Sequence, residues 1–322
     1  MATTRGTATI PADGFTSLRS PQPHFAEFAV SIPPDHVPGE IEWPKGPTNP
    51  RTDFAVASHT RLDEKAFIRR VNAASENSTG VFVHGYNYNF PEALFRTAQM
   101  TADAQISDAP VLFSWPSSAS LLGYASDRES VTYSRDALAE LLTRLADTSG
   151  GKPVTVFGHS MGGWLVMETL RQMRIAGEDE ALSRLEVVLA APDIDVDVFR
   201  QQLAVIGRME IPMVIMVSPD DRALGLSALA GQRTRVGALD ITDPAVQVAA
   251  QQNNMVLIDI SAVDASSSLN HDRYIQLASA FPALARETRQ GSTFTEAGAF
   301  VLSSTGQLLS APLRVVDAAL GQ

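Results

Sequence analysis

The chain has 322 residues, of which 44% are hydrophobic and 19% charged, with a formal net charge of −11 and no cysteine. This composition is typical of a globular protein with a substantial core and differs from that of a disordered chain. The acidic balance disfavours nucleic acid as a partner, and the lack of cysteine excludes disulfides, thiolate metal sites and cysteine nucleophiles.

The first 50 residues hold nine of the nineteen prolines. Short apolar runs between these prolines predict a Pro-rich arm or edge strands over residues 1–53. The start of the chain lacks the apolar core of a signal peptide, and no window reaches the roughly 18 to 20 unbroken apolar residues of a membrane span. We therefore expect a soluble chain without a membrane span. It could be cytoplasmic, or exported with its signal removed, and the sequence leaves the compartment open.

Residues 54–290 alternate short apolar runs with amphipathic segments of helical length. This alternation predicts an α/β domain with a mostly parallel central sheet and helices on both faces. The predicted strands are Gly80–Val83, Val111–Ser114, Val154–Phe157, Leu185–Ala190, Met213–Val217 and Val256–Ile260. The predicted helices are Pro91–Gln105, Ser130–Ala146, Met161–Arg174, Val196–Val205, Ala223–Ala230 and Asp272–Ala280. Residues 291–322 form an apolar segment whose placement the pattern does not determine.

The predicted strand Val154–Phe157 runs directly into Gly158-His159-Ser160-Met161-Gly162, and a helical pattern follows at once. Gly-x-Ser-x-Gly between a strand and a helix is the nucleophile elbow of α/β hydrolases. The flanking glycines permit the sharp turn, because a Cβ there would meet neighbouring backbone. The motif arises by chance in about one chain in ten of this length, so its strand–turn–helix context is what favours Ser160 as a nucleophile.

A serine nucleophile needs a general base, and the chain offers six histidines. They are His24, His36, His59, His84, His159 and His271. In this fold the chain order is serine, acid, histidine, and only His271 follows Ser160. His271 also comes after the last predicted strand. We therefore predict that His271 is the base, the alternative being an ordinary histidine of a surface loop.

The acid is expected after the second strand beyond the elbow, which is Met213–Val217. Asp220 and Asp221 follow this strand, and either could hold the imidazole in the required tautomer. We favour Asp221, because one more residue past Pro219 returns its side chain toward the sheet edge. The other aspartate would then be a solvated loop carboxylate or a helix N-cap. Asp193 is a third candidate.

The predicted strand before the first long helix ends in Val83-His84-Gly85-Tyr86. A His-Gly pair after a strand supplies one oxyanion N–H in many lipases and esterases. By itself such a pair is only a turn, and its place two strands before the elbow gives it weight. We predict that the backbone N–H groups of Tyr86 and Met161 form the oxyanion hole.

Several motifs together resemble the DUF900 family, a group of bacterial α/β-hydrolase-fold proteins of the esterase/lipase superfamily. The resemblance extends from about residue 25 to residue 281. It is carried by Glu42-Trp43-Pro44, His84-Gly85-Tyr86-Asn87, Phe113-Ser114-Trp115-Pro116-Ser117, Tyr124-Ala125-Ser126-Asp127-Arg128, Gly158-His159-Ser160-Met161-Gly162 and Asp221-Arg222-Ala223-Leu224. It implies the fold and the reaction class, and it supports Asp221 as the acid. It implies no particular substrate.

These residues predict a serine hydrolase that cleaves carboxylic esters through an acyl-enzyme, with small-molecule substrates, no nucleic acid partner, and no metal or cofactor. The alternatives are a thioesterase or amidase with the same residues, or a non-catalytic binding protein of this fold. Residues 115–124 are too apolar for an ordinary loop. The candidate pocket residues are Tyr88, Trp115, Leu121, Tyr124 and Trp164. Two of them, Trp115 and Trp164, could equally fill the core. Without a long cap insertion we expect short acyl groups to be preferred.

Overall fold

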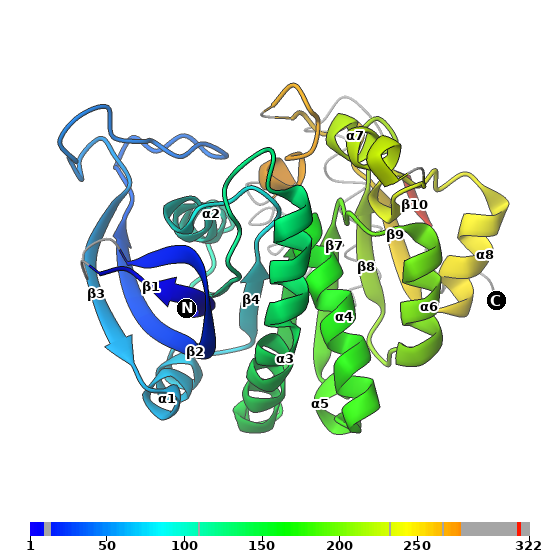
Figure 1. The fold of residues 1–322 in the computed structure, drawn as a ribbon, viewed down its shortest axis with the longest axis horizontal. Helices are drawn as coiled ribbons and strands as arrows, with labels where there is room; N and C mark the ends of the chain where they lie inside the picture. The colour runs from blue at the N-terminus through cyan, green and yellow to red at the C-terminus, as the bar shows by residue number, and fades with distance from the viewer. Residues whose placement is uncertain (10–13, 109, 232, 266, 278–313, 317–322) are drawn as a thin grey trace, which may run out of the picture.

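The computed structural model describes residues 1–9, 14–108, 110–231, 233–265, 267–277 and 314–316. Within these residues one sheet of ten strands has the order β10-β9-β8-β7-β6-β4-β5-β1-β2-β3 (Figure 1). The strands are β1 (Ala2–Thr7), β2 (Phe15–Ser31), β3 (Ala55–Leu62), β4 (Thr79–Val83), β5 (Val111–Ser114), β6 (Val154–His159), β7 (Leu185–Ala190), β8 (Met213–Val217), β9 (Met255–Asp259) and β10 (Arg314–Val316). Strands β4 to β9 are parallel, and β1 joins them parallel to β5. The pairs β1–β2, β2–β3 and β9–β10 are antiparallel.

Helices cover both faces of this sheet (Figure 1). They are α1 (Glu64–Ala74), α2 (Phe90–Asp103), α3 (Tyr124–Thr148), α4 (Met161–Ala176), α5 (Asp179–Ser183), α6 (Val196–Ile206), α7 (Arg222–Gly231) and α8 (Pro244–Gln252), with a 3-10 turn at Val236–Ala238. Along β4, Val81 and Val83 belong to one hydrophobic core, whereas Phe82 belongs to a second core with residues of α2. Both faces of the strand are therefore buried, as in parallel sheets generally. The predicted fold class is confirmed.

The direction in which strands are added to the sheet reverses between β5 and β6. From β4 the chain moves outward to β5, and it then returns to the opposite side of β4 to form β6. Such a reversal sends the helices that follow β4 and β6 to opposite faces of the sheet, and ligands of open α/β sheets bind at this point, beyond the carboxyl ends of the strands. The loop after β4 begins at His84, and the turn after β6 contains Ser160.

The predicted elements agree with the observed ones to within a few residues, with two kinds of exception. Helix α3 begins at Tyr124, so the loop after β5 is shorter and Tyr124 is helical instead of lying in a loop. Helix α1, with Asp63 as its N-cap, the short helix α5, helix α8 and strand β3 were not predicted. Strands β1 and β2, from residues 1–53, are part of the main sheet.

The division into residues 1–53, 54–290 and 291–322 stays a prediction. Of the C-terminal segment only β10 lies among the described residues, and the predicted helix Asp272–Ala280 lies partly outside them. In the described part of the chain no helix is both long enough and apolar enough to cross a membrane.

Candidate active site

Ser160 occupies the sharp turn between β6 and α4. Its backbone angles are φ 55° and ψ −120°, a conformation that costs a non-glycine residue free energy and that clusters at functional sites. The surrounding backbone holds this turn in place. The Ser160 N–H donates to the carbonyl of Ala190 (2.9 Å), and the Ser160 carbonyl accepts from the N–H groups of Gly163 (3.0 Å) and Asp193 (3.2 Å). The residue is only 4% exposed, so little of the elbow is open to solvent.

Two glycines bring the loop after β4 against the elbow. A Cβ on Gly162 would lie 2.4 Å from the carbonyl oxygens of both Val83 and His84. A Cβ on Gly85 would lie 2.7 Å from Nδ1 of His159 and 3.1 Å from Cβ of Ser160. Real Cβ atoms essentially never approach another heavy atom within 3.0 Å, so the contacts of 2.4 Å and 2.7 Å would force a shift of the neighbouring atoms. The absence of side chains at these positions is therefore what allows the two loops to meet.

His271 and Asp221 form a short hydrogen bond at the same edge of the sheet. Nδ1 of His271 lies 2.6 Å from Oδ2 of Asp221, whose side chain is fully buried, whereas the His271 side chain is 19% exposed. The second carboxylate oxygen of Asp221 accepts the N–H of Leu224 in the first turn of α7 (2.9 Å). The carboxylate is thus held from two sides, and it fixes the orientation of the imidazole.

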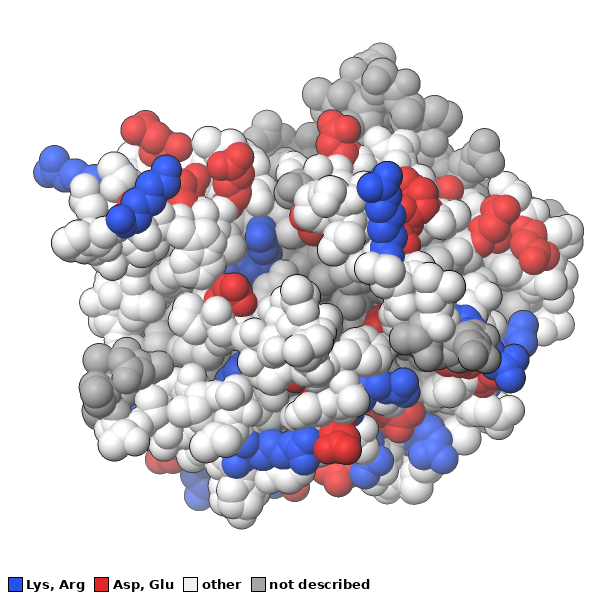
Figure 2. Space-filling view, turned by 45° about the horizontal axis from the view of Figure 1, so that its top comes forward, with Lys and Arg blue, Asp and Glu red and all other residues white. Residues whose placement is uncertain are grey.

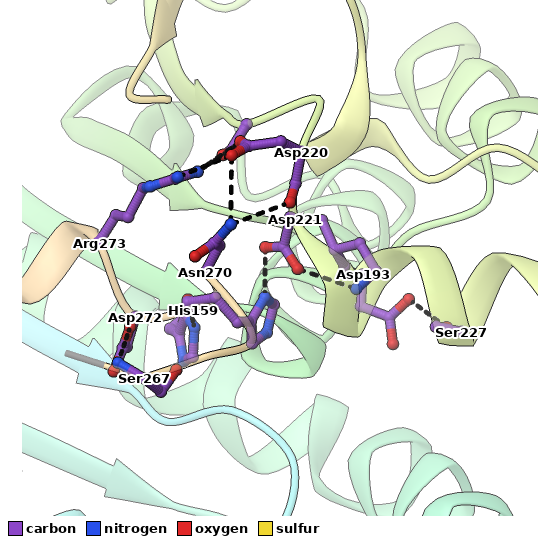
Figure 3. A network of polar contacts seen from close by, with 12 residues as sticks. His159, Asp193, Asp220, Asp221, Ser227, Ser267, Asn270, Asp272 and Arg273 are labelled. Carbon is purple, nitrogen blue, oxygen red and sulfur yellow. Dashed lines mark hydrogen bonds and ion pairs between the residues drawn. The ribbon is translucent and has the colours of Figure 1, made fainter. Parts of the chain in front are cut away.

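Asp220 has a different environment from the one expected for it. It was expected to be a solvated carboxylate or an N-cap, but its two oxygens bind the guanidinium of Arg273 and its Oδ2 accepts from Nδ2 of Asn270 (3.2 Å) (Figure 3). The hydrogen bond from Arg273 is the largest cause that lowers the pKa of Asp220, to about 2. Asn270 and Arg273 flank His271 in the chain. Asp220 therefore holds the loop that carries His271. The N-cap contact, which was expected for Asp220 if Asp221 was the acid, is made by Asp221 to the N–H of Leu224.

Asp193 follows β7 by three residues, and its side chain faces Ser227 (Figure 3). Its carboxylate accepts from the hydroxyls of Tyr124 (2.8 Å) and Ser227 (2.7 Å), and it forms a buried ion pair with Arg235 at 3.3 Å. Burial, followed by the charge of Asp193, raises the pKa of Tyr124 to about 12, so the phenol remains a donor. Asp193 therefore links the start of α3 to α7.

Two more histidines contact the site, and burial keeps both neutral. His159 packs against His271 with a ring-centroid distance of 4.8 Å, and its Nε2 lies 3.2 Å from the His271 carbonyl oxygen. Burial lowers the pKa of His159 well below its usual value, and burial together with nearby Arg5 lowers that of His84 to about 3. The remaining histidines lie elsewhere. His24 is on β2 and His59 on the edge strand β3, and His36 bridges two carboxylates next to α2.

The two predicted oxyanion donors lie on the loops that Gly85 and Gly162 bring together. Met161 is the first residue of α4, and the geometry of a helix gives its N–H no acceptor within the helix. Tyr86 directly follows Gly85, and its phenol donates to the carbonyl of Ser120 (2.9 Å) in the loop after β5.

The candidate pocket residues differ in how deeply they are buried. Trp115 is fully buried, stacks on His84 and donates its indole N–H to the His84 carbonyl (2.8 Å), so it belongs to the core and not to an open pocket wall. Tyr88 and Trp164 are half-buried, the latter beneath the guanidinium of Arg128 at 4.0 Å. Leu121 is 79% exposed in the loop before α3.

The described residues contain no cluster of histidine, aspartate and glutamate side chains that could hold a metal ion. The face that includes the carboxyl edge of the sheet carries scattered acidic and basic residues, and uncharged side chains cover much of its middle (Figure 2).

A family described as "Alpha/beta hydrolase of unknown function (DUF900)" matches residues 60–288. The chain belongs to this family. The match includes the elbow, the loop after β4 and the segments that carry Asp221 and His271. It begins after β1 and β2, which lie outside the matched region. The predicted family resemblance is confirmed.

Individual relatives are more remote. An uncharacterized protein, alr1448 of Nostoc sp. (strain PCC 7120 / SAG 25.82 / UTEX 2576), is 39% identical over 61 residues, which span 19% of this chain and 16% of that protein. A proposed hydrolase from Agrobacterium vitis S4 has 16% identity and a TM-score of 0.36, over 65% of this chain and 89% of the other. A lipase-esterase related protein from Clostridium acetobutylicum ATCC 824 has 13% identity and a TM-score of 0.34, over 67% and 95%.

Proposed function

We propose that this member of the DUF900 family is a serine hydrolase that cleaves carboxylic esters with Ser160, His271 and Asp221. The observation that carries the proposal is the short contact between His271 and the buried Asp221 at the edge of the sheet where Ser160 sits in its strained turn. A carboxylate on Nδ1 places the imidazole proton there. Nε2 is then left free to accept a proton from a hydroxyl.

In this proposal the Ser160 hydroxyl attacks the ester carbonyl while Nε2 of His271 takes its proton. The negative charge on the carbonyl oxygen is stabilised by the N–H groups of Tyr86 and Met161, each contributing about 3 to 4 kcal/mol to the transition state. The imidazolium returns the proton to the departing alcohol, leaving an acyl-serine. Water then attacks the acyl group with His271 again as base, releasing the acid and restoring Ser160.

We further propose a preference for short acyl groups, of roughly two to six carbons in a shallow site. Only five residues separate the end of β7 at Ala190 from the start of α6 at Val196, which leaves no room there for a helical cap. The formal net charge of −11 disfavours a polyanionic substrate.

The test is labelling with a fluorophosphonate, followed by mapping of the modified peptide. We expect modification of Ser160 in the wild-type chain and none in Ser160→Ala. Ester hydrolysis by Ser160→Ala should fall by about 10⁶-fold, because the three side chains act as a unit. Labelling at another residue, or a tenth of the activity retained in Ser160→Ala, would refute the assignment.

A further inference from the structure

We propose that Arg5 of β1 is a positioning residue that fixes the Tyr86 N–H, one of the two oxyanion donors. The inference rests on the proposed esterase function, and it extends the site to a strand that precedes the region matched by the family. Nothing in the local sequence around Arg5 predicts this role. It follows from where β1 joins the sheet and from the contacts that the guanidinium makes.

The register of the sheet places Arg5 beside the active-site loops. Strand β1 runs parallel to β5, with Ala2 opposite Phe113 and Thr3 opposite Ser114. Ser114 is the last residue of β5, so Arg5, two residues beyond Thr3, is level with the loop that follows β5. Because the strands are parallel, the carboxyl end of β1 points to the same edge of the sheet as those of β4 and β6.

The Arg5 side chain is only 1% exposed, and it donates to both loops. Its Nη2 binds the carbonyl of Tyr88 (2.8 Å), in the loop after β4. Its Nη1 binds the carbonyl of Ser117 (3.2 Å), in the loop after β5, and its Nε binds Oγ of Ser114 (2.8 Å). A planar guanidinium can hold several acceptors at fixed angles in this way, whereas an ammonium group cannot.

The contact with Ser114 continues to the oxyanion loop. Ser114 Oγ lies 3.2 Å from Nε2 of His84, and Nδ1 of His84 lies 2.9 Å from the carbonyl oxygen of Gly85. His84 is neutral, so only one of its nitrogens carries hydrogen. Because Ser114 Oγ accepts from Arg5, its own hydrogen is available to Nε2. Nε2 also lies 3.2 Å from the carbonyl oxygen of Trp115, an acceptor that competes for a hydrogen on Nε2. In this proposal the Ser114 hydroxyl donates to Nε2, and the His84 hydrogen is on Nδ1, where it is donated to Gly85.

The Gly85 carbonyl and the Tyr86 N–H belong to one peptide unit. In a trans peptide these two groups point in opposite directions, so fixing the carbonyl also fixes the N–H. The chain from Arg5 through Ser114 and His84 thus orients one oxyanion donor from behind, while the bond to Tyr88 holds the other end of the same loop. None of these side chains needs to touch the substrate.

The charge of Arg5 is balanced nearby. Asp127, at the start of α3, is buried and accepts from the Ser117 hydroxyl (2.6 Å) and from the Ser118 N–H (2.7 Å). Burial lowers the pKa of Arg5 to about 10, with the charge of Asp127 opposing the shift, so the guanidinium is protonated at neutral pH. The loop after β5 is therefore held between a buried cation and a buried anion.

The test compares Ser114→Ala, Arg5→Lys and Arg5→Met with the wild type, using p-nitrophenyl butyrate as substrate and an alkyl trifluoromethyl ketone as inhibitor. The ketone forms a tetrahedral adduct whose oxygen would occupy the oxyanion hole. We expect kcat to fall by about 10- to 100-fold in Ser114→Ala and Arg5→Lys, with KM changed less than about threefold. The inhibition constant of the ketone should rise in parallel with the loss of kcat.

Thr4→Val is the matched control. Thr4 is the equally buried neighbour of Arg5 on β1, and its hydroxyl lies 2.7 Å from Oγ of Ser134 in α3, remote from the oxyanion loop. Thr4→Val should lower the melting temperature but leave kcat and the ketone affinity within about twofold. This control separates positioning of the oxyanion donor from simple anchoring of β1.

Two results would overturn the inference alone. One is an unchanged kcat and ketone affinity in folded Ser114→Ala and Arg5→Lys. The other is an equal loss of kcat in Thr4→Val, which would show that β1 acts only by stabilising the sheet. If Arg5→Met fails to fold, Ser114→Ala decides, because it removes one hydroxyl and leaves the other Arg5 contacts. A wild-type chain that neither hydrolyses the ester nor reacts with a fluorophosphonate would instead refute the proposed function itself.

Discussion

The two adjacent aspartates after β8 allow a sharp test of the proposed mechanism. In Asp221→Asn the substituted amide must present one oxygen and one NH₂ group where the carboxylate presented two oxygens. The buried N–H of Leu224 requires the oxygen on its side, because it now donates to Oδ1 at 2.9 Å. The NH₂ group then faces Nδ1 of His271. An NH₂ group there forces Nδ1 to accept, so the imidazole hydrogen moves to Nε2, which can no longer act as the base.

The magnitude follows from the cost of the opposite orientation. Turning the amide would restore the useful tautomer but would set its NH₂ group against the buried Leu224 N–H, leaving donors unpaired at about 1 to 3 kcal/mol. At the upper end this lowers the population of the useful tautomer by about 10²-fold. The lost carboxylate charge no longer stabilises the imidazolium and accounts for the remainder. We expect kcat to fall by about 10⁴-fold in all.

Asp220→Asn is the matched comparison. It weakens the ion pair with Arg273 and the contact with Asn270, the residues that flank His271. The Asp220 side chain is 51% exposed, so solvent screens this ion pair. We expect a loss of kcat of less than about tenfold and a melting temperature lower by a few degrees. Steady-state hydrolysis of p-nitrophenyl acetate and thermal unfolding would measure both. If Asp221→Asn keeps a tenth of wild-type kcat, or if the two variants are equally impaired, Asp221 is not the acid.

Three further predictions concern the elbow, the loop next to α2 and the substrate. Gly162→Ala should destabilise the fold by about 3 kcal/mol through its 2.4 Å contacts with two carbonyls, whereas Gly225→Ala, with no atom near its Cβ position, should be neutral or stabilising in urea unfolding. Burial alone would lower the pKa of His36, but hydrogen bonds to Glu42 and Asp103 outweigh it and raise the pKa. Because a raised pKa in the folded state stabilises only while the group is protonated, the free energy of unfolding should fall as the pH rises above about 6.5, and His36→Gln should flatten this slope. Across a series of p-nitrophenyl esters, kcat/KM should be highest between roughly two and six acyl carbons, and an optimum at ten or more would contradict the proposed shallow site.

The sequence predicted the parts of the molecule that depend on local pattern. Strands that are buried on both faces are short apolar runs in the sequence. Their bounds were predicted closely because few other structural elements have this pattern. Helix α1 was missed, although Asp63 is an ordinary N-cap accepting from the Ala66 N–H. Its apolar residues are few, with only Phe67 and Val71 buried, so the helical period was hard to see. Strand β1 carries Thr3, Thr4 and Arg5, all buried, and a polar buried strand resembles a surface segment in sequence.

The partners of individual side chains were the harder part to predict. Asp220 and Asp221 are adjacent, and position along the chain could rank them but could not reveal the partner of either one. Arg273 selects Asp220 because it lies two residues beyond His271 on the same loop, and the Leu224 N–H selects Asp221 because α7 begins at the next residue. The first choice depends on a contact between residues 53 positions apart, which no local pattern records, whereas the second is a local contact over three residues.

Close backbone approach explains why the elbow was predictable and its support was not. A Cβ on residue 162 would lie 2.4 Å from two carbonyl oxygens, so only glycine fits there. The close approach of the two loops is therefore visible in the sequence as Gly162. Buried carbonyl oxygens can receive their hydrogen bonds from more than one place in the chain, because an arginine on any strand with a suitable register could reach them. In this chain the register of β1 against β5 brings Arg5 to Tyr88, 83 positions further along. Removing residues 1–9 should therefore impair the oxyanion loop as well as the sheet edge, even though the family match begins only at residue 60.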